Sequence, residues 1–188
     1  IQASEDSIKK KKSMENFLLP SKISFEESKE PNNAKLTVEP CYFGYGTTLG
    51  NALRRVMLSS LPGAAVTSVK IVGVDQEFQS VENVKDDVLK ICLNLKNLRM
   101  KVHTDEPVKL TMKTKGIKTV TAADFDKNSD VEIVNPELEI TEITDKKAEL
   151  EMEVTVQKGR GYWPTEERTK EDVEIGTILV DAVFSPVR

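Results

Sequence analysis

The sequence predicts an α+β fold in which a helix-bearing start gives way to strands after Pro62 and Gly63. Two patterns predict it. Residues 49–60 place apolar side chains at the three-to-four spacing of a helix, and residues 148–156 alternate strictly between apolar and polar side chains, as a strand with one packed face does. The chain has 188 residues, 38% hydrophobic and 31% charged, which is the composition of a globular protein of one or two domains.

The charge of the chain favours protein partners. The net charge is −4 and the pI is about 5.3, whereas a protein that binds nucleic acid by itself usually carries a basic surplus. We therefore expect no direct DNA contact. No apolar run approaches the roughly 18 residues of a membrane span, so no membrane partner is expected and a cytosol-like compartment is the default.

Catalytic and metal-binding patterns are scarce. Cys41 and Cys92 lie far apart and His103 is the only histidine, so the short-spaced ligand set of a zinc site is missing and no catalytic residue, metal or cofactor is expected. The Gly159–Tyr162 stretch resembles a phosphate-binding loop superficially, since backbone amides and an arginine can hold an anion. A small anion- or nucleotide-binding enzyme built on this loop is thus the alternative to a structural or interface loop.

The first sixty residues predict a tail, a strand and a helix. Residues 1–16 contain a lysine run and almost nothing to bury, which is typical of a mobile terminus. Residues 34–38 alternate as a half-buried strand that Pro40 ends. Thr47 or Thr48 is expected to cap a helix that stops before Pro62.

This first helix has apolar residues on two sides. At about 100° per residue, one face contains Leu49, Ala52, Leu53, Val56 and Ser60, and the opposite side contains Arg54, Arg55 and Leu58. A large apolar residue between two arginines has two interpretations: an exposed leucine among solubilising charges, or a second contact surface, because arginine is enriched at protein interfaces.

The remainder predicts mostly strands. A second helix is expected to follow Ser80 and to run through residues 81–98, and hairpins are expected between 99–103 and 108–112 and between 138–140 and 148–156. The final run, 178–186, is apolar on nearly both faces. Its cover must come from residues 17–60 or from outside the chain.

Three segments together resemble one family. They are 38–63, with its core Phe43-Gly44-Tyr45-Gly46-Thr47-Thr48-Leu49-Gly50-Asn51-Ala52-Leu53-Arg54-Arg55; Gly159-Arg160-Gly161-Tyr162; and 176–187. In this order and spacing the chain is similar, over residues 17–188, to the N-terminal part of the alpha subunit of bacterial and plastid DNA-directed RNA polymerase.

The resemblance implies a non-catalytic scaffold with two lobes. A dimerisation lobe would comprise residues 17–62 and 175–188, and a β-rich lobe, 63–174, would be inserted between them. The expected partners are a second alpha subunit and the beta and beta-prime subunits. The expected dimer interface contains Tyr45, Leu49, Leu53 and Val56, with the last three packed in the lobe. The expected large-subunit docking residues are Arg54, Arg55, Leu58, Gly159, Arg160, Gly161 and Tyr162.

The chain departs from the family pattern at both ends. Its N-terminal tail is longer, and it stops at Arg188, where the family continues with a strand, a long helix, a linker and a DNA-binding domain. We therefore expect the dimerisation lobe to be C-terminally incomplete. The resemblance implies bacterial cytoplasm or plastid stroma as the compartment.

Overall fold

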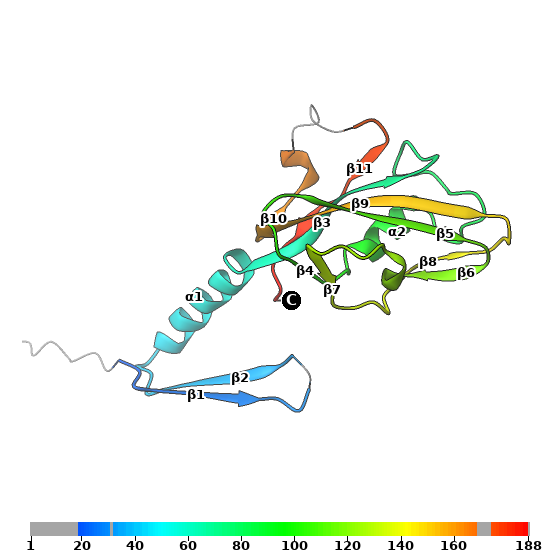
Figure 1. The fold of residues 1–188 in the computed structure, drawn as a ribbon. Helices are drawn as coiled ribbons and strands as arrows, with labels where there is room; N and C mark the ends of the chain where they lie inside the picture. The colour runs from blue at the N-terminus through cyan, green and yellow to red at the C-terminus, as the bar shows by residue number, and fades with distance from the viewer. Residues whose placement is uncertain (1–18, 31, 169–173, 188) are drawn as a thin grey trace, which may run out of the picture. The chain divides into compact units, whose positions relative to one another are not determined.

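The computed structural model describes residues 19–30, 32–168 and 174–187, and the predicted tail, 1–16, lies outside them. Contacts within the chain divide it into two compact units, residues 1–54 and 55–188. Helix α1, Tyr45–Ser59, contains the division point (Figure 1).

The first unit contains a β-hairpin and most of α1. Strands β1, Lys22–Glu27, and β2, Ala34–Glu39, pair antiparallel, and the turn between them closes with Ser28 N–H donating to the Asn33 carbonyl at 3.0 Å. The predicted strand at 34–38 is confirmed, but β1 was not predicted. The predicted helix is confirmed and ends at Ser59, yet it begins at Tyr45, so Thr47 and Thr48 lie inside its first turn and neither is the N-cap.

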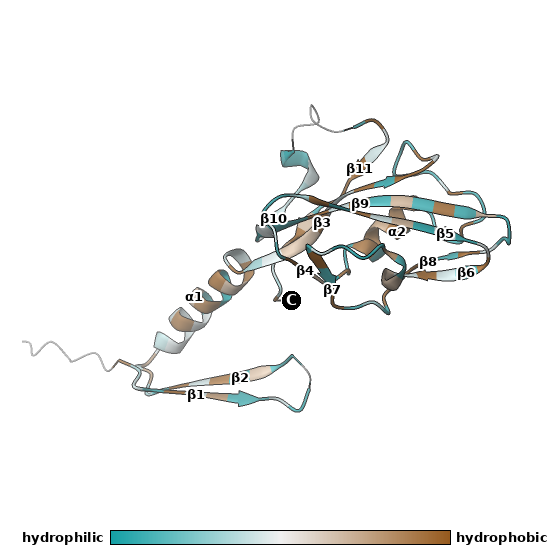
Figure 2. Ribbon diagram, viewed as in Figure 1, coloured by the Kyte–Doolittle hydropathy of each residue, from teal (hydrophilic) through white to brown (hydrophobic). Residues whose placement is uncertain are grey.

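A four-stranded antiparallel sheet organises the second unit. Its order is β11 (Thr177–Leu179), β3 (Pro62–Ile71), β9 (Glu149–Arg160) and β5 (Val108–Lys115). The alternation predicted for β9 is confirmed, since every second side chain is buried: Leu150, Met152, Val154 and Val156. Figure 2 shows the same alternation of hydrophobic and hydrophilic residues along this strand.

Shorter elements pack against the buried face of the sheet. They are α2 (Val88–Leu95), β4 (Met100–Val102) paired with β7 (Val131–Ile133), and β6 (Lys118–Thr121) paired with β8 (Glu139–Ile143), with a 3₁₀ turn, Ala122–Asp124, after β6. Their buried side chains and those of the sheet form one hydrophobic core. The confirmed α+β class therefore consists here of a sheet covered on one face by a helix and two short strand pairs.

The second helix is shorter than predicted. The Asp87 carboxylate accepts the Lys90 N–H at 2.8 Å and caps a helix that begins at Val88, whereas residues before it form turns. Val81 and Val84 still pack against the core, which explains the helix-like apolar spacing upstream. The apolar spacing therefore predicted correctly that these side chains pack against the core, but it predicted a helix where the backbone forms turns.

Both predicted hairpins are wrong. β4 pairs with β7, while β5 pairs with β9; β8 pairs with β6, while β9 pairs with β3 and β5. The elements exist almost where predicted, but they pair with strands distant in the sequence. Strand alternation identifies a buried face and does not identify the neighbouring strand.

The final apolar run is covered by the second unit itself. β11 pairs with β3, and β12, Ala182–Val183, pairs with β10, Tyr162–Trp163. Ile178 and Val180 join the main core, and Phe184 packs with Ala65, Ala182 and Trp163. Within the described residues, most of the cover therefore comes from β3, β10 and the core and not from residues 17–60, which supply one hydrogen bond, from Ser185 to the Met57 carbonyl.

Gly63 shows how closely this final segment approaches β3. A Cβ atom built on Gly63 would collide with the carbonyl oxygen of Phe184, which is backbone and cannot rotate away. Gly50, inside α1, has no atom within 4 Å of the corresponding position. A methyl group therefore has space at Gly50 but not at Gly63.

We expect Gly63→Ala to lower the free energy of unfolding by about 1–3 kcal/mol, because the added methyl group pushes the 184–186 segment off β3. Gly50→Ala is the matched control and should leave stability unchanged or raise it by up to about 1 kcal/mol. Urea unfolding followed by circular dichroism measures both. Equal stability of Gly63→Ala and the parent chain would contradict the close approach.

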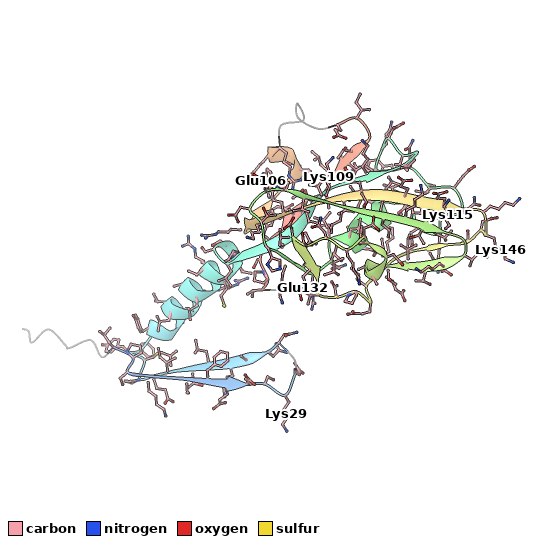
Figure 3. All side chains as sticks on the ribbon, viewed as in Figure 1. Lys29, Glu106, Lys109, Lys115, Glu132 and Lys146 are labelled. Carbon is pink, nitrogen blue, oxygen red and sulfur yellow. The ribbon has the colours of Figure 1, made fainter. Side chains whose placement is uncertain are left out.

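Lysines and glutamates alternate across the exposed face of the sheet. Lys113 Nζ lies 2.9 Å from Glu149 Oε1 and 2.7 Å from Glu151 Oε2, and Lys115 Nζ lies 3.0 Å from Glu149 Oε2. Lys109 and Lys115 lie near the two ends of β5 in Figure 3. The hydrogen bond from Lys113, followed by that from Lys115, holds the pKa of Glu149 below its ordinary value.

A lowered carboxyl pKa stabilises the folded state above the ordinary carboxyl pKa, and this contribution is lost as the pH falls through the folded-state pKa. We expect Lys113→Met to be less stable than the parent chain near pH 7, and the difference to shrink as the pH falls below about 4. Urea unfolding across this pH range measures it. Lys146→Met, which removes an exposed lysine outside these pairs, is the control. A difference that does not change with pH would refute the ion-pair account.

Candidate protein interface

Helix α1 exposes apolar side chains along its length. None of its 15 residues is buried, and Leu53, Val56 and Leu58 are 44%, 52% and 42% exposed. Hydrophobic bands run along this helix in Figure 2. A helix of this length gains little stability from its own backbone in water, so packing of an apolar face is normally what holds it.

The four side chains expected at a dimer interface divide into two pairs. Tyr45 and Leu49 are half-buried, and Leu53 and Val56 are exposed. The expectation that Leu53 and Val56 pack within the lobe therefore does not hold for the described residues. The described residues leave this apolar face open to another contact.

The Gly159–Tyr162 loop joins β9 to β10 through a tight turn. Gly161 has a φ of 66°, in the left-handed region that glycine adopts without strain, and its carbonyl accepts the Phe184 N–H at 2.9 Å. A Cβ on Gly159 would lie 2.6 Å from the Phe184 ring. These glycines are required by close packing, and the Phe184 ring occupies the side of Gly159 where a side chain would project.

The structure brings this loop against the C-terminal end of α1. A Cβ on Gly161 would lie 3.4 Å from the Ser59 carbonyl oxygen, and the Ser185 hydroxyl donates to the Met57 carbonyl at 3.1 Å. The register explains the meeting, because the first pair between β3 and β9 is Pro62 with Arg160. Two segments that are a hundred residues apart thus form one surface where Ser59 meets Gly161. Among the residues predicted for docking, Arg55 and Leu58 lie in the helix end beside this contact, and Gly159, Arg160, Gly161 and Tyr162 lie in the loop.

Arg55 and Arg160 are exposed on this surface, and Arg54 is exposed on the same helix. Tyr162 is also exposed. Its pKa is raised, first by partial desolvation and then by the neighbouring Asp181 carboxylate. The phenol therefore stays protonated and can donate a hydrogen bond at any physiological pH.

A cluster that sequence reasoning missed supports β10. The Arg168 guanidinium stacks on the Trp163 ring at 4.2 Å, and it donates to the Thr67 carbonyl at 2.6 Å and the Trp163 carbonyl at 3.1 Å. Desolvation lowers the pKa of Arg168. Asp181 accepts the Thr165 N–H at 3.0 Å, and chiefly this bond lowers the pKa of Asp181. The bulky Trp163 next to the loop was the only signal in the sequence.

Three features of the described residues bear on metal binding, membrane contact and thiol reactivity. Within 19–30, 32–168 and 174–187, no three His, Cys, Asp or Glu side chains group as metal ligands. Among the same residues, no helix is long and apolar enough to cross a membrane. Burial raises the pKa of Cys92 to about 11, so this thiol is a poor nucleophile.

Known proteins resemble this chain over most of its length. The family model described as RNA polymerase Rpb3/RpoA insert domain matches residues 69–185. The DNA-directed RNA polymerase subunit alpha of Symbiobacterium thermophilum is 53% identical over 154 residues, which cover 82% of this chain and 49% of that protein.

Two further relatives are also DNA-directed RNA polymerase alpha subunits. The protein of Alkaliphilus metalliredigens is 49% identical over 164 residues, which cover 87% of this chain and 52% of that protein. The protein of Alkaliphilus oremlandii is 49% identical over 162 residues, which cover 86% of this chain and 51% of that protein. The chain thus spans about half the length of the curated relatives it matches. Because the family model covers more than half of the sequence, this chain belongs to the family of the RNA polymerase Rpb3/RpoA insert domain and is similar to bacterial alpha subunits.

Proposed function

We propose that this chain is a non-catalytic assembly subunit of DNA-directed RNA polymerase, a nucleotidyltransferase complex, in bacterial cytoplasm or plastid stroma. Membership of the family supports the assignment to the polymerase complex. The observation that carries the scaffold role is α1, a 15-residue helix with apolar side chains and no buried residue. A second alpha subunit and the beta and beta-prime subunits are the proposed partners.

The two sides of α1 would serve different partners. Tyr45, Leu49, Leu53 and Val56 are the proposed dimer contacts. Arg54, Arg55 and Leu58, with the Gly159–Tyr162 loop, are the proposed docking surface for the large subunits. The proximity of Ser59 to Gly161 supports a single docking surface made from the helix end and the loop.

An enzyme that binds an anion through the Gly159–Tyr162 loop has little support. The Phe184 ring lies against Gly159, and the Gly161 carbonyl is already bonded to the Phe184 N–H. The relatives are polymerase alpha subunits. Both glycines therefore have a packing explanation that needs no ligand.

We expect Arg55→Ala to weaken binding of the isolated beta subunit by about tenfold or more, because arginines at the centre of interfaces are frequent hot spots. Folding stability should change by less than about 0.5 kcal/mol, since Arg55 is exposed. A fluorescence titration with labelled beta subunit and a urea melt measure the two quantities.

Arg99→Ala is the matched control, because Arg99 is also exposed and the change in charge is the same. It should bind beta normally. Equal beta affinity of Arg55→Ala and the parent chain would remove Arg55 from the docking surface.

We expect Leu53→Asp to leave the fold intact, because the Leu53 side chain is 44% exposed in the chain. The same change should abolish self-association, because in a dimer the new carboxylate would be buried against an apolar partner surface. Analytical ultracentrifugation over a concentration series measures the association, and circular dichroism measures the fold. Ile117→Asp, at an exposed apolar position outside α1, is the control and should associate as the parent chain does. Identical association of Leu53→Asp and the parent chain would exclude this face.

A further inference from the structure

Among the described residues, the outer edge of β11 has a peptide group without a strand neighbour. Ile178 pairs with Val69, and Val180 N–H donates to the Thr67 carbonyl at 2.9 Å, so these residues bond towards β3. In an antiparallel pair, alternate residues point their N–H and C=O groups in opposite directions. The N–H and C=O of Leu179 therefore point away from β3, and no hydrogen bond reaches them from the described residues.

A groove of about 560 Å³ is lined in part by the residues of β11. Its walls come from the loop after β3 and from the 3₁₀ turn Thr165–Glu167 that follows β10. Its lining residues are Asp75, Gln76, Glu77, Phe78, Thr165, Glu166, Thr177, Ile178 and Leu179. An edge strand in a groove of this kind is the arrangement by which an extended peptide adds to a sheet.

The lining indicates the chemistry of the occupant. It contains three carboxylates, Asp75, Glu77 and Glu166, and no lysine or arginine. None of the three forms an ion pair among the described residues, although most carboxylates on the exposed face of the sheet do. Phe78 is 77% exposed in the groove wall and can take an apolar side chain. The negative potential excludes nucleic acid and favours a cationic partner.

We propose that this groove docks an extended basic segment of a partner protein, which adds as a strand beside Leu179 and places apolar side chains against Phe78. The N–H and C=O of Leu179 supply the main-chain bonds, and Asp75, Glu77 and Glu166 hold lysine or arginine side chains. The proposal is independent of the assembly role, because the groove contains none of the residues assigned to dimerisation or large-subunit docking.

A capped seven-residue peptide alternating lysine and valine tests the proposal on the full chain. Fluorescence anisotropy should show binding that weakens as salt rises, and the double variant Glu77→Lys, Glu166→Lys should weaken it by about tenfold or more. Glu137→Lys is the control, since Glu137 is exposed and unpaired among the described residues and lies outside the groove. It should bind the peptide as the parent chain does.

Two further measurements separate strand addition from attraction between charges. The same peptide with alternate amides N-methylated keeps its charge but cannot pair along one edge, so at least one of the two methylation registers should lose binding. Hydrogen exchange at the Leu179 amide should be fast in the free chain and protected by the unmodified peptide. Undiminished binding of both methylated registers, slow exchange at Leu179 without peptide, or unchanged affinity of the double variant would each overturn the proposal.

Discussion

The pairing of β9 with β3 is the constraint on which the second unit depends. It joins Pro62 to Arg160 and continues to Ile71 and Met152, so it aligns two segments that are separated by about half of the chain. Because α1 ends just before β3, this register also sets the helix end beside the turn that follows β9. The proposed docking surface is therefore a consequence of strand register, and a slip by one residue would move Gly161 away from Ser59 and turn the core side chains of β9 outward.

Close backbone approach makes that register specific. The Phe184 carbonyl lies over Gly63 and the Phe184 ring over Gly159, on two neighbouring strands. Each glycine leaves space for the final segment, whose Ala182 and Phe184 in turn pack with Ala65 and Trp163. The Phe184 ring occupies the space beside Gly159 and the Phe184 carbonyl the space beside Gly63. The C-terminal segment 182–186 is therefore part of the structure of the second unit.

The sequence predicts the elements better than it predicts their neighbours. The alternation of 148–156 and the three-to-four spacing of 49–60 report which side chains are buried or aligned, and both predictions are confirmed. Pairing was predicted locally, as hairpins, because nothing in Val108 or Ile140 distinguishes a near strand from a far one. In the candidate site, too, the sequence reveals residues but not their contacts. Gly159 and Gly161 stand out in the sequence, whereas Phe184, which packs against them, does not. No sequence spacing reveals the stacking of Arg168 on Trp163.

Charge pairing separates the two kinds of surface on the second unit. On the sheet face, Lys109 and Lys113 lie between glutamates, so the charges cancel and hydrated ion pairs leave little to attract a partner. At the β11 edge the carboxylates of Asp75, Glu77 and Glu166 have no such cations among the described residues, and Leu179, whose peptide group has no partner among those residues, lines the same groove. An unpaired strand edge is a hazard for aggregation, and like charges around it repel a second copy of the same edge. The three carboxylates of the groove therefore have two effects: they oppose pairing between identical chains, and they attract a segment of opposite charge.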